Sequence, residues 1–438
     1  MNRTALLALF SIAMLLPHAA RADEASTLKE LQQFNAYIER DNRQPGKPVI
    51  AIYVHSPQVT DALAERLKDF KKLERVGLNG TSATDTALQA LKGLKDLHTL
   101  NLHGTRVTDA GLKELKPLKK LQYLNLSETR VSDKGLKELQ GFTKLETLEL
   151  NDTVVSDAGL RGLKALPQLR SLHLNSTRVT GGWLQELKDF KQLQRVFLRN
   201  SGVTDAGLKR LKGPAPVQEL VLAGTEITDA GLVGLKGCPQ LKILDLGKTR
   251  ITGPGLKELE GLEQLHELIL IDSPVTDVGM KALRGCKRLS ALRLWGTRVT
   301  DEGLKELKGL EELQIVELFH CKVTGNGIKE LQGLPKLWAL GLYDTRFTDA
   351  DLAALKDFKQ LHSLRIDQTQ ITDAGLKELK GLTGLLYLHL DFTRVTDAGL
   401  KELTGLKKLR TLSLIGTKVT DAGVKELRAA LPKCEIRR

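Results

Sequence analysis

The chain repeats one phrase at a fixed interval, and this repeat constrains the fold more than any other feature. An apolar residue opens each repeat, and the spacing between neighbouring openings never departs from 24. The sixteen openings are Val59, Ala83, Val107, Val131, Val155, Val179, Val203, Ile227, Ile251, Val275, Val299, Val323, Phe347, Ile371, Val395 and Val419. This predicts a stack of like units, because each unit can bury its apolar face only against its neighbours.

The two halves of a repeat predict two kinds of element. Residues 107–130 read VTDAGLKELKPLKKLQYLNLSETR, and we number these positions 1 to 24. Positions 6, 9 and 12 are apolar at helical spacing, with Thr at position 2 as N-cap and Asp at position 3 at the positive end of the helix dipole. Apolar positions 18 and 20 alternate with polar ones, which predicts a short strand. We expect a left-handed glycine at position 11 to end the helix, as at Gly93, Gly141, Gly261, Gly309, Gly381 and Gly405.

The expected fold class is therefore α/β: a curved, horseshoe-like solenoid with a parallel sheet on its concave face and short helices on its convex face. The pattern L-x-x-L-x-L-x-x-T-x-V-T-D-A-G-L, which covers about residues 49–436, resembles the bacterial VTDAGL-type leucine-rich repeat. It is similar to the cysteine-containing subtype of the ribonuclease-inhibitor-like superfamily, but Thr or Ser stands where Cys would, except at Cys321. The resemblance implies recognition of a macromolecule on the concave face.

The sequence predicts four segments. Residues 1–22 resemble a secretory signal, with Arg3, an apolar stretch over 5–16 and a small-x-small cleavage site at 20–22. Residues 23–58 are expected to form the N-terminal cap, with an amphipathic helix over 26–40, a turn over 43–48 and a first strand from Val49. Fifteen full repeats follow over 59–418, and 419–438 form a truncated repeat and C-terminal cap. No other apolar run could span a bilayer, so we expect an exported periplasmic or extracellular protein.

The sequence offers little catalytic chemistry. Cys238 and Cys286 both occupy position 12, two repeats and so about 10 Å apart, which predicts buried thiols rather than a disulfide. The motifs H-E-x-x-H, G-x-S-x-G and C-x-x-C are missing, and no residues have metal-ligand spacing. We therefore expect no enzyme, no cofactor and no metal, and keep a hydrolase site assembled across adjacent strands as the least favoured alternative.

The variable positions 17, 19, 21 and 22 are expected on the concave face. At position 21, Ile271, Trp295, Phe319 and Tyr343 follow one another in adjacent repeats and predict an apolar stripe with charged neighbours. Such a surface favours a protein partner, with a glycan as the alternative. The predicted binding residues are Arg293, Trp295, Glu317, Phe319, His320, Tyr343, Arg365, Asp367, Tyr387, His389, Asp391 and Phe392.

The net charge of +13 suggests a second surface. Position 24 is usually Arg or Lys and precedes Asp at position 3 of the next repeat by three residues, which predicts a ladder of local ion pairs. In three repeats glycine replaces that Asp, so Arg178, Arg250 and Lys322 are predicted to be unpaired and available to a polyanion. Export argues against nucleic acid and favours an acidic protein or an anionic envelope polymer. The sequence does not predict the oligomeric state.

Overall fold

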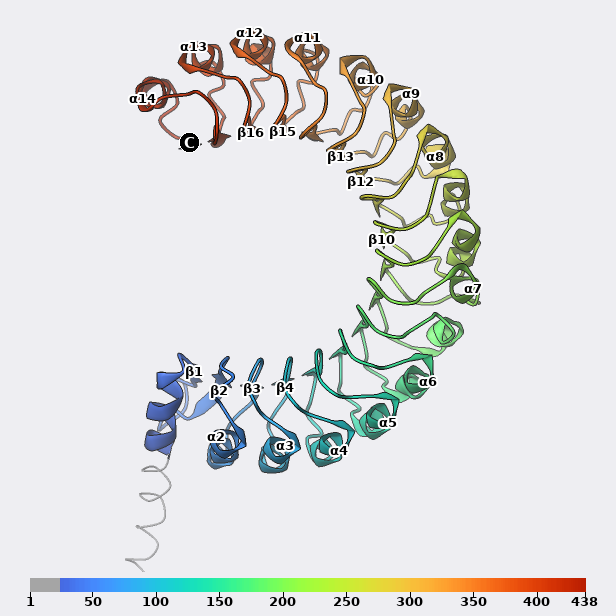
Figure 1. Cartoon of the computed structure of the whole chain (residues 1–438), viewed down its shortest axis with the longest axis vertical. Helices are drawn as coiled ribbons and strands as arrows, with labels where there is room; N and C mark the ends of the chain where they lie inside the picture. The colour runs from blue at the N-terminus through green and yellow to red at the C-terminus, as the bar shows by residue number, and fades with distance from the viewer. Residues whose placement is uncertain (1–23) are drawn as a thin grey trace, which may run out of the picture. The chain divides into compact units, whose positions relative to one another are not determined.

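The computed structural model describes residues 24–438, so the predicted signal segment 1–22 lies outside the described residues. The chain divides into two compact units, which we call the N-terminal unit (through Gly202) and the C-terminal unit (Val203–Arg438). Within each unit a short strand, a turn and a short helix alternate along the chain, with strands on the inner side of the curve and helices on the outer side (Figure 1). The predicted α/β leucine-rich-repeat solenoid is confirmed.

The sheet of the N-terminal unit begins with one antiparallel pair and continues with parallel pairs. β1 runs antiparallel to β2, and β2 to β8 pair in chain order. Each parallel partner lies one full repeat further on, as Leu100 pairs with Leu124. The strands are β1 (Tyr37–Arg40), β2 (Val49–Tyr53), β3 (Arg75–Gly77), β4 (Thr99–Asn101), β5 (Tyr123–Asn125), β6 (Thr147–Glu149), β7 (Ser171–His173) and β8 (Arg195–Phe197).

The C-terminal unit has a wholly parallel sheet with the same offset of one full repeat between paired positions. Its strands are β9 (Glu219–Val221), β10 (Ile243–Asp245), β11 (Glu267–Ile269), β12 (Ala291–Arg293), β13 (Ile315–Glu317), β14 (Ala339–Gly341), β15 (Ser363–Arg365), β16 (Tyr387–His389), β17 (Thr411–Ser413) and β18 (Glu435–Arg437).

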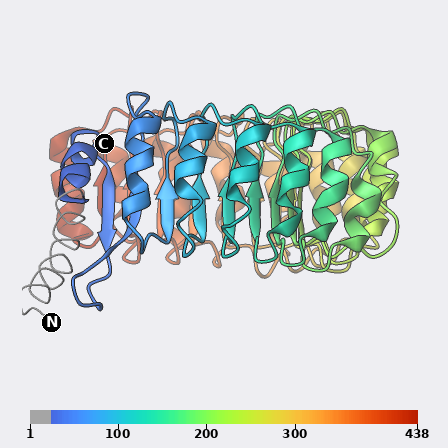
Figure 2. The ribbon, with the colours of Figure 1, turned by 90° about the horizontal axis from the view of Figure 1, so that it is seen from below.

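Short helices cover one face of each sheet, and the core lies between the helices and that face. The view onto the N-terminal unit shows its helices in front of its strands (Figure 2). The α-helices are α2 (Asp61–Arg66), α3 (Asp85–Leu91), α4 (Asp109–Leu112), α5 (Asp133–Leu136), α6 (Asp157–Leu160), α7 (Asp205–Leu208), α8 (Asp277–Ala282), α9 (Asp301–Leu304), α10 (Gly325–Lys329), α11 (Asp349–Leu352), α12 (Asp373–Leu376), α13 (Asp397–Leu400) and α14 (Asp421–Ala430).

Tighter 3-10 helices continue most of these α-helices and replace them in three repeats, where η5, η6 and η7 stand alone. They are η1 (Leu67–Asp69), η2 (Lys113–Leu115), η3 (Lys137–Gly141), η4 (Arg161–Ala165), η5 (Leu184–Asp189), η6 (Asp229–Gly237), η7 (Pro254–Leu259), η8 (Leu283–Gly285), η9 (Lys305–Leu307), η10 (Ala353–Leu355), η11 (Lys377–Gly381) and η12 (Lys401–Leu403).

The leucines of the repeat form the core of each unit. In one repeat, Leu112, Leu115, Leu118 and Leu121 are all fully buried between helix and strand, as is Leu124 at the centre of β5. Burying a leucine side chain contributes about 2 kcal/mol, so several leucines per repeat supply the main stabilisation. No single repeat could enclose them, which explains why the phrase recurs without a gap.

The Thr-Asp pair at positions 2 and 3 joins each repeat to the next. Thr108 caps α4 by accepting a hydrogen bond from the N–H of Ala110, as predicted. The Asp does more than the sequence indicated, because Asp85 accepts both the N–H and the hydroxyl of Thr108, 2.8 and 2.6 Å away. The same two-bond contact joins Asp373 to Thr396. In both units it recurs in most repeats, between the Asp at position 3 and the Thr or Ser at position 2 of the next repeat. We call this series the Asp–Thr ladder.

The ladder also explains the glycine at position 5. A Cβ on Gly375 would lie 2.4 Å from Oδ1 of Asp349, so only glycine leaves room for the carboxylate of the preceding repeat. One pair of repeats exchanges the two residues: Gly325 stands at position 3 and Asp351 at position 5 of the next repeat. The Asp351 carboxylate accepts the N–H of Gly325 at 2.7 Å and of its own N-cap, Thr348, at 2.8 Å, so the contact is rebuilt from the other side.

The prediction of left-handed glycines at position 11 is largely wrong. Among the six glycines named above, only Gly309 has positive φ, at 98°. The left-handed residue of the repeat lies instead at position 22, in the turn that follows the strand. In the repeats of the other five glycines the helix ends without a left-handed residue, because a tight turn and a hydrogen bond from the following N–H close it, as at Phe142. Glycine at position 11 therefore has no special conformational role there.

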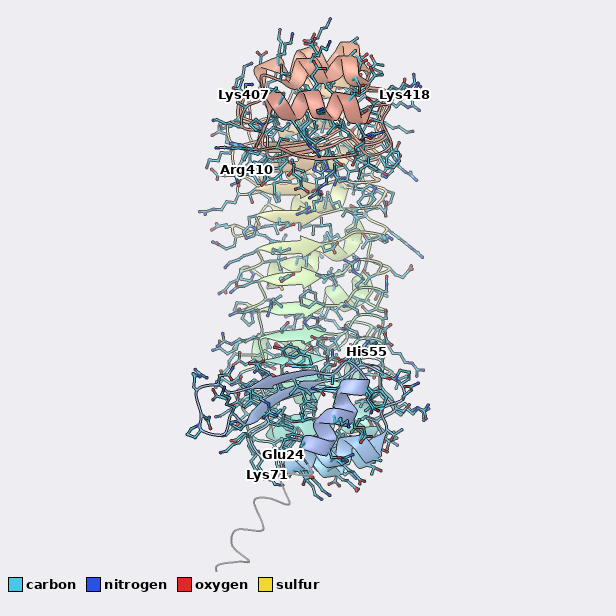
Figure 3. All side chains as sticks on the ribbon, turned by 90° about the vertical axis from the view of Figure 1, so that its left-hand side faces the viewer. Glu24, His55, Lys71, Lys407, Arg410 and Lys418 are labelled. Atoms are coloured by element: carbon cyan, nitrogen blue, oxygen red, sulfur yellow. The ribbon has the colours of Figure 1, made fainter. Side chains whose placement is uncertain are left out.

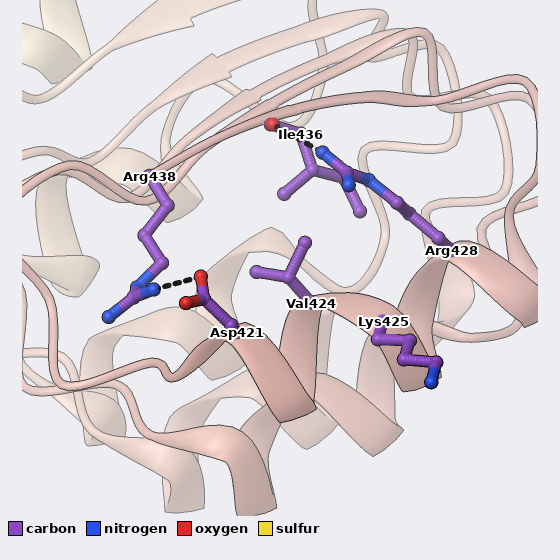
Figure 4. Close-up of a pocket in the computed structure, with 6 residues that line it drawn as sticks. All are labelled: Asp421, Val424, Lys425, Arg428, Ile436 and Arg438. Atoms are coloured by element: carbon purple, nitrogen blue, oxygen red, sulfur yellow. Dashed lines mark hydrogen bonds and ion pairs between the residues drawn. The ribbon is translucent and has the colours of Figure 1, made fainter.

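Both caps differ in detail from the prediction. Residues 24–33 are helical, but the helix predicted over 26–40 ends early and is followed by β1, which pairs with β2 across the predicted turn. At the C-terminal end β18 pairs with β17 and continues the parallel sheet into the cap. Arg438 pairs with Asp421 there, and Arg428 donates to the carbonyl of Ile436 at 3.5 Å (Figure 4).

The four cysteines are free and buried, as predicted. Burial raises the pKa of both Cys238 and Cys286 to about 12. Cys321 stands where other repeats have Thr, and its thiol donates to the carbonyl of Leu294 at 3.1 Å. Among the residues that the structure describes, no helix has the length and apolar character to cross a membrane.

The exchange between Gly325 and Asp351 suggests a double-mutant cycle at the equivalent positions one repeat further along, Asp349 and Gly375. The quantity compared is the free energy of unfolding. Gly375→Asp alone places a second carboxylate against Asp349 and should lower the free energy of unfolding by about 2 kcal/mol, through crowding and repulsion. Asp349→Gly alone removes the acceptor for Thr372 and should cost about 1–3 kcal/mol. The double variant reproduces the natural exchange and should recover most of the loss.

Urea unfolding followed by circular dichroism would measure all four proteins under one condition. If the two single losses simply add in the double variant, position 3 and position 5 are not coupled as the structure indicates.

Candidate functional site

The predicted binding residues lie on the inner face of the C-terminal unit, on β12 to β16 and the turns after them. Their side chains point away from the leucine core, because positions 17 and 19 flank the buried centre of each strand. Parallel pairing brings equal positions of successive repeats side by side, so Arg293 pairs with Glu317 and Arg365 with His389 in the sheet register. The structure divides eleven of the twelve residues into three groups and two exposed aromatic residues, and the twelfth, Arg365, contacts both the first and the third group.

Trp295, Phe319, His320 and Tyr343 form the first group, which we call the ring cluster. Phe319 meets Trp295 and Tyr343 edge to face, with ring centroids 5.9 and 5.8 Å apart. His320 stacks on Trp295 at 5.7 Å and meets Tyr343 edge-on at 5.2 Å. Aromatic pairs in such geometries contribute about 0.5–1.5 kcal/mol beyond their buried area, so these contacts stabilise the arrangement of the four rings.

Phe319 is the centre of the ring cluster rather than an exposed anchor, which corrects its expected exposure. Only 8% of its surface is accessible, whereas 38% of Trp295 is accessible. The ring lies over Gly341 on the next strand, where an added Cβ would come within 2.1 Å of it. The guanidinium of Arg365 also lies over this ring, 5.1 Å from its centroid. The sequence signal for this packing was glycine at a strand position beside a large aromatic.

Arg293 and Glu317 belong to the second group, a chain of ion pairs beside the ring cluster. Arg293 lies between Glu317 and Glu267, with nitrogen–oxygen distances of 2.8 and 2.9 Å. Burial opposes its charge, but its hydrogen bonds to Glu267 and the charge of Glu317 raise the pKa of Arg293 above its usual value. Glu267 was missed by the sequence analysis, although it occupies position 17 of the repeat before.

Asp367, His389 and Asp391 form the third group, a cluster of possible metal ligands that the spacing of residues in the sequence does not indicate. One ligand atom from each lies within 4.8 Å of the others. Burial lowers the pKa of His389, while the neighbouring Asp367 carboxylate acts in the opposite direction. The nearest cation is Arg365, whose Nε donates to Asp367 at 3.2 Å.

Tyr387 and Phe392 are exposed and stand apart from the ring cluster. Phe392 is 57% accessible and has a left-handed backbone, with φ of 56°. The turn requires that conformation at position 22 in most repeats, where Gly, Asp, Asn or another polar residue usually stands. A phenylalanine at this position is therefore unfavourable on two counts, exposure and conformation.

The predicted polyanion site is corrected in part. Arg250 is paired with Glu226, so it is not a free cation. Arg178 and Lys322 are exposed and have no ion-pair partner among residues 24–438, but the same holds for Arg106 and Arg394, whose repeats keep the Asp. The expected ladder of Arg–Asp pairs is wrong, because the Asp carboxylates are already bound to threonine in the Asp–Thr ladder.

Basic residues also lie on other surfaces, where many are paired. In the last repeats Lys418 lies at one edge and Lys407 and Arg410 lie at the other (Figure 3). On the helical side, Lys at position 10 pairs with Glu at position 8 of the next repeat, as Lys116 with Glu138 at 2.6 Å. The net charge of the chain is thus distributed and does not mark one anionic ligand.

The N-terminal unit contains a Ser–His contact that bears on the hydrolase alternative. The hydroxyl of Ser171 lies 2.9 Å from Nε2 of His173, and His173 stacks on Phe197 at 4.2 Å. Glu149 on the neighbouring strand is bound to Tyr123 and Asn125 instead of the imidazole, and burial together with this carboxylate raises the pKa of Tyr123 to about 12. Because Ser171 is completely buried, its hydroxyl cannot reach a substrate.

The pKa of His389 gives a test of the third group. We expect a pKa below the ordinary 6.5, because burial outweighs the nearby carboxylates, so the folded state loses stability as the pH falls below 6.5. Asp367→Asn should lower the pKa further, whereas Arg365→Gln should raise it, because these charges act in opposite directions. Titration of the imidazole signals by NMR would measure all three proteins. A pKa at or above 6.5 in the parent would contradict the packing described.

Comparison with known proteins agrees with the fold. The family model described as Leucine Rich repeat matches residues 118–139 and 237–259, one segment in each unit. A leucine-rich-repeat protein of Leptospira interrogans is similar in structure, with a TM-score of 0.62 and 24% identity over 85% of this chain and 92% of that chain. The structure of TLR13 in complex with ssRNA13 gives a TM-score of 0.59 and 16% identity over 88% of this chain and 61% of that one.

A search of curated proteins finds no match. In total 533 chains of known structure are similar, so the fold is widespread and does not by itself select a ligand. The chain therefore has the leucine-rich-repeat fold, and its function has to be argued from its variable surface.

Proposed function

We propose that the protein is a non-enzymatic recognition or scaffold protein that binds a protein partner on the inner face of its C-terminal unit. The observation that carries the proposal is the ring cluster, where Trp295 is partly exposed and packs on Phe319 and His320, which both contact Tyr343. Exposed Trp and Tyr with charged neighbours are typical anchors of protein interfaces. The leucine-rich-repeat fold is a common scaffold for such binding, which supports the proposal without naming the partner.

The geometry of the ring cluster favours a protein over a glycan. A sugar ring stacks on the free face of an aromatic, but His320 already lies on one face of Trp295, tilted by only 21°. Phe319 and Tyr343 meet edge to face, so they do not form a flat row of open ring faces. An irregular aromatic surface of this kind suits the apolar side chains of a protein.

The charges around the ring cluster disfavour a polyanion. Arg293 is neutralised by two glutamates and Arg365 by Asp367, so positive and negative groups alternate along the surface. Alternating charges give specificity and orientation to a protein complex rather than general attraction for one sign. Binding through this face should therefore depend weakly on salt, whereas binding of an anionic polymer would weaken steeply.

The proposal is tested by a matched pair of tryptophan variants. The parent, Trp295→Ala and Trp338→Ala would be immobilised and exposed to an envelope extract from the source organism, with bound proteins identified by mass spectrometry. Trp338 is a suitable control, because it is as accessible as Trp295, at 37%, but lies outside the ring cluster. A partner should be lost with Trp295→Ala, by about tenfold or more in affinity, and kept with Trp338→Ala.

Equal retention by all three proteins would refute the ring cluster as the binding surface. Retention of carbohydrate that is lost with Trp295→Ala would instead support the glycan alternative. Phe319→Ala is less suitable as a test, because removing a buried phenylalanine costs about 3–5 kcal/mol and would disturb the whole cluster.

We further propose that the protein is exported to the periplasm or the cell exterior, on the basis of the signal-like residues 1–22. The exported form should begin at Asp23, as N-terminal sequencing of protein from periplasmic and culture fractions would determine. Ala20→Leu and Ala22→Leu together should block cleavage, because the cleavage site requires small residues. Full-length, uncleaved protein in the cytoplasmic fraction of the parent would refute export.

A further inference from the structure

The group formed by Asp367, His389 and Asp391 has properties that binding of a protein partner does not explain. Asp367 follows β15, while His389 and Asp391 lie on β16 and directly after it. Asp367 is almost completely buried, at 2% accessible, and the other two are half-buried. We propose that these three side chains form a binding site for a divalent transition-metal ion such as Zn²⁺.

Both aspartates have a structural task that does not require a charge. Oδ1 of Asp367 accepts the N–H of Asp391 at 3.3 Å, and Oδ1 of Asp391 accepts the N–H of Ile415 at 2.7 Å. Each carboxylate thus holds the backbone of the next repeat with one oxygen. The second oxygen of Asp391 remains available to a further partner.

The N-terminal unit holds the same arrangement with amides in place of the carboxylates. Asn151, His173 and Asn175 occupy the same repeat positions, nine repeats earlier. Oδ1 of Asn151 accepts the N–H of Asn175 at 2.9 Å, and Oδ1 of Asn175 accepts the N–H of Arg199 at 2.8 Å. Asparagine therefore performs the structural task completely, and the fold tolerates it at both positions.

The carboxylates at 367 and 391 add a cost that the amides avoid. Like charges on adjacent strands repel, and one of these carboxylates is buried. Arg365 neutralises Asp367, whereas Arg437, two strands from His389, is already paired with Glu435. A bound cation accounts for the negative charge that remains on Asp391 and for the imidazole that lies beside both carboxylates.

The donor set selects the class of metal. One imidazole nitrogen and two carboxylate oxygens suit Zn²⁺ and related first-row ions, whereas Ca²⁺ and Mg²⁺ prefer oxygen alone. Burial favours the neutral imidazole, which is the form that binds metal. Ligand atoms lie about 2.0–2.2 Å from Zn²⁺, so the three atoms, now within 4.8 Å of one another, need to approach by about 1 Å. Three protein ligands leave one coordination position open to water.

Arg365 does not prevent this binding. Its Nε occupies one lone-pair direction of Asp367, and a carboxylate offers about four such directions. Binding of the ion would draw the two carboxylates together, while Arg365 keeps its contact with the ring of Phe319.

Calorimetric titration of the full chain with ZnCl₂ tests the proposal in the absence of any partner, so its outcome is independent of the proposed function. The parent should bind one equivalent that Asp367→Asn/Asp391→Asn weakens at least 100-fold, because two of three ligands are lost. The double variant should fold, since Asn151 and Asn175 show that amides fit. Asp344→Asn is the matched control: it removes a His–Asp contact of 2.6 Å at His320 and should leave the affinity unchanged.

Titration with Co²⁺ adds a spectroscopic readout, because its visible absorption reports the nitrogen and oxygen ligands directly. His389→Gln should abolish the spectrum and provides a second variant if the double variant does not fold, as judged by circular dichroism. Identical Zn²⁺ titrations of the parent and a folded Asp367→Asn/Asp391→Asn variant would overturn the proposal, as would equal weakening by Asp344→Asn.

Discussion

The structure depends on one constraint, which is that equal positions of successive repeats stack on one another in register. Parallel pairing with an offset of one full repeat fixes this register at the strands, and the Asp–Thr ladder fixes it again at the helix starts, where Asp85 holds Thr108 with two bonds. Each side chain therefore has its counterpart from the next repeat as a neighbour. The leucines of successive repeats therefore form a continuous core, and the residues at position 21 form a continuous row on the inner face.

The exchange of Gly325 and Asp351 shows that the repeated phrase encodes contacts between repeats rather than a single folded unit. Position 3 of one repeat and position 5 of the next share one space, which a carboxylate from either side can fill. Gly253 and Gly279 leave this space without a carboxylate, and Thr276 then bonds to the carbonyl of Thr252 instead. The phrase is thus best understood as a description of an interface.

The fold could be predicted because its determinants recur, whereas the site depends on features that occur once. Buried Leu124 and the capping Thr108 follow directly from the pattern. The burial of Phe319 depends on the missing side chain of Gly341 in the next repeat, and the pairing of Arg250 depends on which neighbour a long side chain selects. The Asp367–His389–Asp391 group escaped a motif search because its members belong to two different repeats, and their spacing is meaningful only once the strands are paired.

At position 21, the aromatic residues of the C-terminal unit lack a hydrogen bond that asparagine makes at the same position in the N-terminal unit. At Asn151 and Asn175 the side chain accepts the N–H of position 21 in the next repeat. Tryptophan and phenylalanine have no acceptor, so Trp295 and Phe319 forgo this bond, which is worth about 1 kcal/mol each. Edge-to-face contacts within the ring cluster offset part of that loss. The rest, together with the exposure of Trp295, is unfavourable for the free protein, and burial against a partner would recover it.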